Sequence, residues 1–173
     1  MHTVVVLAGN AEPPAVADAL DRLPPGASDP VVVCGPGQRE PIKQVTDASR
    51  VVVDSVPDGS VVSAMRAGLR AASTATAVVT TPSSPTLTGE ALGRLAPGDD
   101  ADVGLARVGG DRHPPLGAYA VGPTTVACDT TLATGSERLS NVYARLDVTT
   151  TDVDTASPVG DGAGGKAVGK TDG

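Results

Sequence analysis

The sequence predicts an α/β fold, a three-layer α/β/α sandwich whose sheet is mostly parallel. Short runs rich in valine alternate with segments of helical periodicity along most of the 173 residues. The stretch Val51–Leu92 predicts a strand, a turn, a helix, a second strand and a second turn in succession, which is a βαβ unit. The connections between these segments are short. Together these observations favour one layer of strands with helices on both of its faces.

The first half of the chain begins with Thr3–Leu7, a continuous apolar run typical of a strand buried on both faces. Pro13 and Pro14 suit the first turn of a helix, and the pair Pro24-Pro25 ends it. The later elements expected in this half are strands at Val31–Cys34 and Val51–Val53 and helices at 41–45 and 60–72.

The second half continues the alternation but indicates a mixed sheet, because two of its strands alternate only partly between apolar and polar residues. Thr88 is a candidate N-cap for a helix that runs to Leu95. The other expected elements are strands at Ala77–Thr81, Val103–Arg107, Leu116–Val121 and Asp147–Val153, and helices from Pro123 and from Ser136. We expect one domain over residues 1–157 and a disordered, glycine-rich tail over 158–173.

Composition excludes several classes of function. The formal charge is −7 and lysine occurs only at positions 43, 166 and 170, which argues against nucleic acid as a partner. No apolar run reaches the length of a membrane span. The N-terminus lacks the basic segment of a signal peptide, and Cys34 and Cys128 form no metal or disulfide motif. We therefore expect a cytoplasmic protein with two buried thiols.

The apolar residues are small. They make up 40% of the chain, yet there is no Phe or Trp and there are only two tyrosines. A core of Val, Ala and Leu is expected to be modest in stability per residue. Few bulky hydrophobic residues, little lysine and much aspartate together give a composition similar to that of halophilic proteins.

Candidate functional residues follow from the sheet, because ligands of such folds bind beyond the carboxyl ends of the strands. The loops at these ends are 9–14, 35–38, 54–59 and 81–87. Asp54 directly follows a buried strand and is a candidate for contact with a nucleotide or with Mg²⁺, but an aspartate here also suits a turn. Gly59 precedes a helix that could receive a phosphate at its N-terminus or could simply be capped there.

Four segments, taken in order, carry a resemblance to a known family. They are VVVLAGN at the N-terminus, VVVDSVPDGSVVSAMRAGLRAA from Val51, TTPSSPTL from Thr80, and LATGSERLSNVYARL from Leu132. The chain resembles the molybdenum cofactor guanylyltransferases, which are MobA-like NTP transferases, over about residues 3–158. The resemblance implies a nucleotide-diphospho-sugar transferase-like fold. It also implies transfer of a guanylyl group from GTP to the molybdopterin cofactor with release of pyrophosphate, assisted by Mg²⁺.

The same resemblance assigns roles to individual residues. Leu7, Ala8 and Gly9 match the turn whose backbone cradles the nucleotide phosphates. Asp54 and Gly59 match nucleotide-binding positions, and the carboxylate of Asp54 could also reach a metal ion.

The chain departs from the family pattern where the family keeps its chemistry. Asn10 and Ser63 replace glycines, Ser83 replaces the aspartate that holds Mg²⁺, and a loop with Arg and Lys is absent after Asn10. A neutral hydroxyl holds Mg²⁺ less well than a carboxylate, and the loss of one organised electrostatic contact typically costs about 10²–10³ in rate. These departures predict an impaired transferase.

Three alternatives remain open at this point. The chain could be a non-catalytic relative that binds a nucleotide or an active partner, or a decayed product with no ligand, or a subunit that receives the missing lysine from a partner protein. The nucleotide base and the acceptor are also open, because related transferases of other substrates share the architecture.

Overall fold

A computed structural model describes residues 2–47, 50–56 and 59–155. In this part of the chain seven strands form one sheet in the order β3-β2-β1-β4-β6-β5-β7. The strands are β1 (His2–Gly9), β2 (Ala27–Cys34), β3 (Arg50–Val53), β4 (Thr76–Thr80), β5 (Val103–Val108), β6 (Asp111–Ala120) and β7 (Val148–Asp152). The helices are α1 (Pro13–Asp21), α2 (Arg39–Val45), α3 (Val61–Ala71), α4 (Gly89–Leu95), α5 (Val121–Ala133) and α6 (Leu139–Tyr143).

The sheet is mostly parallel, with one reversed strand. β1 pairs in parallel with β2 and β4, β2 pairs in parallel with β3, and β5 pairs in parallel with β7. β6 lies antiparallel between β4 and β5. The predicted α/β class and the predicted mixed character of the second half are therefore confirmed.

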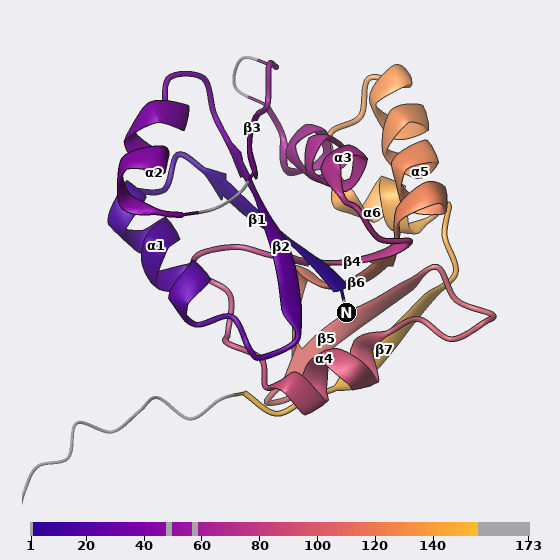
Figure 1. The fold of residues 1–173 in the computed structure, drawn as a ribbon. Helices are drawn as coiled ribbons and strands as arrows, with labels where there is room; N and C mark the ends of the chain where they lie inside the picture. The colour runs from indigo at the N-terminus through magenta and orange to yellow at the C-terminus, as the bar shows by residue number, and fades with distance from the viewer. Residues whose placement is uncertain (1, 48–49, 57–58, 156–173) are drawn as a thin grey trace, which may run out of the picture.

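Helices cover both faces of the sheet, which gives the expected three layers (Figure 1). Alternate residues of β1 point to opposite faces, and each face has its own apolar cluster. Val4 and Val6 pack with Val16 of α1 and Leu92 of α4. The neighbouring Val5 packs on the other face, in a cluster with residues of α3, α5 and α6.

Side chains cap the starts of two helices. The Ser60 hydroxyl accepts a hydrogen bond from the backbone N–H of Ser63, and Thr88 caps α4 in the same way. Val61, the first residue of α3, is 36% exposed. Arg66 and Arg70 of α3 both contact Asp129 of α5, so they link two helices of one layer.

Two boundaries in the second half were predicted wrongly. β6 starts at Asp111 rather than at Leu116. The first half of the strand was not predicted because Pro114 and Pro115 are unfavourable in strands. α6 spans only Leu139–Tyr143, much less than the helix expected from Ser136.

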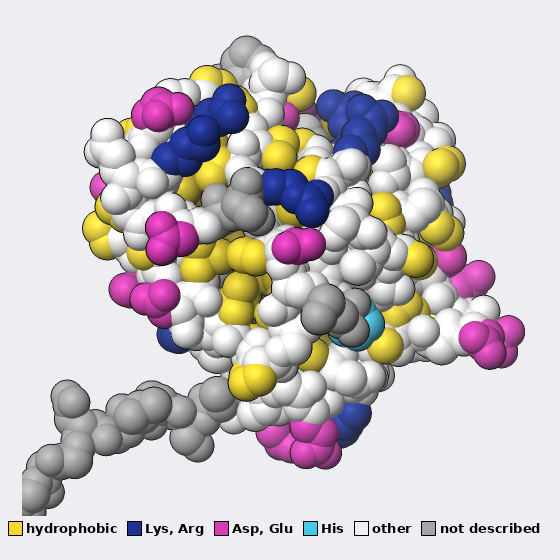
Figure 2. All heavy atoms as spheres, viewed as in Figure 1, with side chains coloured by type: hydrophobic (Ala, Val, Ile, Leu, Met, Phe, Trp, Pro, Cys, Tyr) yellow, Lys and Arg dark blue, Asp and Glu magenta, His cyan; other side chains and the backbone are white. Residues whose placement is uncertain are grey.

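Other expectations concern the thiols, the membrane and the C-terminal tail. Cys34 and Cys128 are both buried free thiols, as predicted. Within the described residues, no helix has the length and apolar character that crossing a bilayer requires. The predicted tail at 158–173 lies outside the described residues. On the face drawn in Figure 2, basic side chains stand in small separate groups among acidic and neutral ones.

Candidate functional site

A pocket of about 340 Å³ lies where β1, β2 and β3 end and α3 begins. This is the crevice in which open α/β sheets bind their ligands, and its volume falls within the range of small-molecule sites. Its described lining comprises Gly9 and Asn10 after β1, Val33, Cys34, Gly35 and Pro36 at the end of β2, Asp54 and Val56 after β3, and Gly59 and Ala64 at the start of α3. We call it the strand-end pocket.

Asp54 is the one ionisable carboxylate in the described lining of this pocket, and it is turned inward. Its Oδ2 accepts a hydrogen bond from the Ser63 hydroxyl at 2.6 Å. Its Oδ1 accepts one from the backbone N–H of Val56 at 3.2 Å, and the side chain is only 7% exposed. The carboxylate thus ties β3 to α3, which is the turn-forming role that the sequence left open beside a ligand role.

Gly59 is required by this arrangement for steric reasons. A Cβ on Gly59 would lie 2.3 Å from Asp54 Oδ2 and 2.8 Å from Ser63 Oγ. No side chain fits there unless the hydrogen-bonded pair moves. The predicted importance of Gly59 therefore has a reason internal to the fold, in addition to any contact with a ligand.

Of the turn predicted to bind phosphate, 7–9, part lies in the hydrophobic core and part lines the strand-end pocket. Leu7 and Ala8 are buried in the two apolar clusters and are not among the residues that line the pocket, whereas Gly9 lines it. The backbone N–H of Ala11 donates to the Ala8 carbonyl at 2.8 Å. This donor is consumed within the turn and is not directed at a ligand.

Ser83, at the family's metal position, lies outside the strand-end pocket. It is exposed in the loop between β4 and α4, and its hydroxyl lies 3.1 Å from the hydroxyl of Thr81. The structure therefore brings Gly9, Asp54 and Gly59 together and leaves Ser83 apart from them.

The donor groups present do not fit a resident Mg²⁺ ion. The ion is usually held by one or two carboxylates together with water or substrate phosphates. Asp54, the one carboxylate in the described lining, is only 7% exposed and is held by the Ser63 hydroxyl and the Val56 N–H instead. Among the described residues, no three His, Cys, Asp or Glu side chains are grouped as a metal site. The described lining of the pocket also contains no Lys or Arg that could neutralise a phosphate.

The pocket contains a thiol that stays protonated at neutral pH. Burial raises the pKa of Cys34, and the charge of Arg39 offsets this effect only in part. A protonated thiol is a weak nucleophile, so Cys34 contributes shape to the site rather than covalent chemistry.

Sequence reasoning identified Asp54 and Gly59 but missed the part played by Ser63. Ser63 was recognised as a departure from a glycine, yet its bond to Asp54 joins residues nine positions apart across a turn. No local pattern signals such a pair. It could be proposed only by considering Ser63, a hydroxyl in place of a glycine, together with the Asp54 carboxylate as one feature.

Replacing Ser63 by alanine is expected to lower the free energy of unfolding by about 2 kcal/mol, because it leaves a buried carboxylate oxygen without its donor. Urea denaturation followed by circular dichroism would measure the change. Ser140→Ala, at an exposed position of another helix, is the matched control and should change stability by less than about 0.5 kcal/mol. Equal stabilities of the two variants would contradict a structural role for the Ser63–Asp54 bond.

Several solved structures share this architecture. A protein of Aquifex aeolicus VF5 aligns with a TM-score of 0.72 and 13% identity over 89% of this chain and 88% of that chain. Molybdopterin-guanine dinucleotide biosynthesis protein A from Archaeoglobus fulgidus aligns with a TM-score of 0.65 and 18% identity, over 87% of this chain and 83% of that chain. The 4-diphosphocytidyl-2C-methyl-D-erythritol synthase of Anaerococcus prevotii DSM 20548 aligns with a TM-score of 0.60 and 11% identity, over 88% of each chain.

These likenesses show that the chain shares the three-layer α/β fold of these proteins. No curated protein matches the sequence. The family model described as the MobA-like NTP transferase domain matches residues 4–150, which includes every strand of the sheet except the last two residues of β7 and the first two of β1. The chain therefore belongs to the MobA-like NTP transferase family.

Proposed function

We propose that this chain binds the nucleoside part of GTP in the strand-end pocket and transfers the guanylyl group to the molybdopterin cofactor slowly or not at all. The observation that carries the proposal is the charge of the pocket. Its described lining holds one carboxylate, Asp54, and no Lys or Arg. A site of this kind suits a neutral, hydrogen-bonding ligand better than a triphosphate.

The N-terminus of α3 supports the same reading. The positive end of a helix is a ready site for a phosphate. Here the Asp54 carboxylate already occupies the turn that leads into α3 and bonds to Ser63 in its first turn. A phosphate at this position would meet a negative charge. Each carboxylate oxygen retains one lone pair that can accept from a ribose hydroxyl or from the N–H groups of guanine.

Phosphoryl transfer depends on neutralising charge that develops on the phosphate oxygens. Because the donor set does not fit Mg²⁺ and the pocket's described lining lacks a cation, no catalytic step is assigned to this chain's own residues. The second candidate, a non-catalytic relative that binds nucleotide beside an active partner, is favoured by the same observation. We also propose a cytoplasmic location, where free thiols such as those of Cys34 and Cys128 stay reduced.

Calorimetric titration with guanosine, GTP, ATP and CTP, each with Mg²⁺ and with EDTA, tests the proposal. We expect guanosine and GTP to bind with affinities within about threefold of each other and with no dependence on Mg²⁺, since charge-assisted bonds to Asp54 dominate. Asp54→Asn keeps the acceptor for Ser63 but removes the charge, and should weaken guanosine about tenfold. Asp21→Asn, at an exposed position, is the control.

Two results would overturn the proposal. The first is Mg²⁺-dependent binding of GTP with no binding of guanosine. The second is formation of the guanine dinucleotide cofactor at the rate of an ordinary enzyme, detected by mass spectrometry with molybdopterin as acceptor. Absence of binding by any nucleotide to folded protein would also reject it and would leave the partner-dependent reading.

A further inference from the structure

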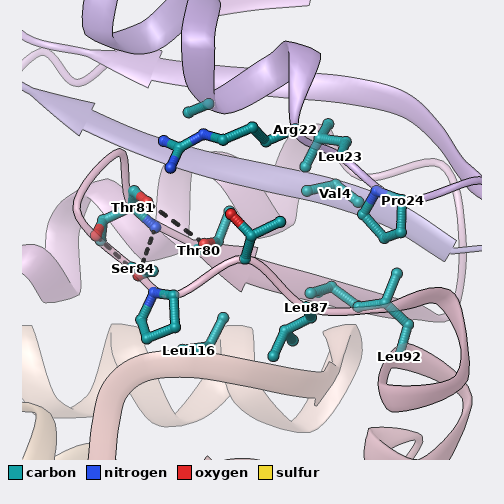
Figure 3. Close-up of a pocket in the computed structure, with 14 residues that line it drawn as sticks. Val4, Arg22, Leu23, Pro24, Thr80, Thr81, Ser84, Leu87, Leu92 and Leu116 are labelled. Atoms are coloured by element: carbon teal, nitrogen blue, oxygen red, sulfur yellow. Dashed lines mark hydrogen bonds between the residues drawn. The ribbon is translucent and has the colours of Figure 1, made fainter. Parts of the chain in front are cut away.

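A second cavity lies on the other side of β1, between the end of α1 and the loop that joins β4 to α4 (Figure 3). We call it the Arg22 cavity. Its described lining comprises Val4, Ala19, Arg22, Leu23, Pro24, Val78, Thr80, Thr81, Ser84, Pro85, Thr86, Leu87, Leu92 and Leu116. None of these residues lines the strand-end pocket, so the two sites are separate.

The body of the cavity is apolar and small. Val4 and Val78 form part of its floor on the sheet, and Ala19 faces it from α1. The chain has no Phe or Trp to fill such a gap. The volume of about 40 Å³ is room for roughly three water-sized groups, because one water needs about 10–15 Å³. An apolar gap of this size is expected to take a short branched alkyl group.

One end of the cavity is polar and carries hydroxyl groups. The hydroxyls of Thr81 and Ser84 lie 2.9 Å apart. The Ser84 hydroxyl also accepts from the backbone N–H of Thr81 at 3.1 Å. These contacts hold both hydroxyls at the rim, where Figure 3 shows them beside the apolar residues.

Arg22 places a cation at the same end. Its Nε donates to the Asp18 carbonyl at 3.0 Å and its Nη2 donates to the Pro82 carbonyl at 3.2 Å. These bonds fix the direction of the guanidinium group, which extends toward the loop of Thr81 (Figure 3). Neither bond uses Nη1, which remains able to donate to a ligand.

The charge of the cavity is opposite to that of the protein. The chain carries a formal charge of −7, yet the described residues that line this cavity include one arginine and no Asp or Glu. A site with a cation, two hydroxyls and an apolar body has complementary chemistry to a small anion with a hydrocarbon end.

We propose that the Arg22 cavity binds a short branched aliphatic carboxylate. The alkyl end fills the space between Ala19, Val78 and Leu92. The carboxylate accepts from Arg22 and from whichever hydroxyl of the Thr81–Ser84 pair does not donate within the pair. This site lies beyond the proposed nucleotide function and does not depend on it.

The test is a titration of methyl-labelled full-length protein with 3-methylbutanoate, followed by NMR. Saturable shifts of the Val78, Leu87 and Leu92 methyl groups are expected at low millimolar concentration. The uncharged isostere 3-methylbutanamide should bind at least about fivefold more weakly than the acid, because it loses the charge-assisted bond. Shifts should be unaffected by saturating guanosine, which separates this site from the strand-end pocket.

Arg22→Gln tests the cation directly and should weaken 3-methylbutanoate about fivefold or more. The matched control is Arg94→Gln, because Arg94 also lies near a helix end and donates to a backbone carbonyl, that of Asp152. The control should change the affinity less than twofold. The proposal is overturned if no methyl shift saturates, if the amide binds as well as the acid, or if both variants behave alike.

Discussion

Replacing Gly68 by alanine is expected to lower the free energy of unfolding by about 2 kcal/mol. Gly68 lies on the buried side of α3, where the helix crosses the sheet. A Cβ at this position would lie 2.3 Å from Val5 Cγ1 and 2.9 Å from Val33 Cγ2. Both valines are fully buried, so the helix must move away from the sheet, and overpacking of this kind costs about 1–3 kcal/mol.

Gly93 provides a matched control on the other face of the sheet. It also lies within a helix, α4, but a Cβ added there would meet nothing within 4 Å. Gly93→Ala should therefore stabilise the protein by about 0.5–1 kcal/mol, since alanine has a higher helix propensity than glycine. Urea denaturation of both variants measures the two changes. Changes of the same sign would refute the close packing of α3 on β1 and β2.

A loss of stability at alkaline pH is the second large effect that we expect. Burial, with a smaller contribution from the charge of Asp129, raises the pKa of Cys128 from 9.0 to about 12. Burial likewise raises the pKa of Tyr143 from 10.0 to about 12, although its hydrogen bond with Tyr119 lowers it somewhat. Burial first, and then the proximity of Tyr143, raises the pKa of Tyr119 well above its ordinary value.

The direction of this change in stability follows from the number of protons that the folded and the unfolded chain bind. Above pH 9 the unfolded chain loses the Cys128 proton while the folded chain keeps it, so the stabilising difference is complete below pH 9 and is lost as pH rises toward 12. One pKa unit corresponds to about 1.4 kcal/mol. By pH 11 the loss from Cys128 alone is about 3 kcal/mol, and the tyrosines add to it above pH 10.

Urea denaturation at pH 8, 9, 10 and 11 measures this dependence. Cys128→Ala, compared with the unsubstituted protein at each pH, should give a shallower decline, whatever its stability at pH 8. Parallel declines in the two proteins would mean that the Cys128 thiol is not the group responsible.

Parts of the fold were predictable because local signals and tertiary packing agreed. The valine runs at 4–6, 31–33 and 51–53 are strands, and Ser60 and Thr88 cap helices as their positions in the sequence indicate. β6 was only half predicted, since Pro114 and Pro115 are poor strand residues. Both fall outside its pairing with β4, which covers Gly117–Ala120, so the missing N–H groups cost the sheet nothing there.

The strand and helix pattern led to two residues of the candidate site. Asp54 was proposed because it follows a strand and Gly59 because it precedes a helix, and both line the strand-end pocket. Leu7 and Ala8, proposed through their backbone, have side chains buried in the core. Arg22 gave no signal at all, because its partner Pro82 is 60 positions away. Contacts of this range depend on how α1 packs on the sheet, and no local pattern encodes that packing.

The strand order also has a consequence for how the chain is made. The first four strands of the chain pair only with one another until β6 is added to β4. When residues up to about 80 have left the ribosome, these four strands have been made but β6 has not. Any sheet that they form at this stage lacks the strand that covers β4. β4 is then an open edge of the nascent sheet, and such edges promote association between chains. The reversed strand β6 pairs with β4, so its synthesis removes this edge as a route to association between chains.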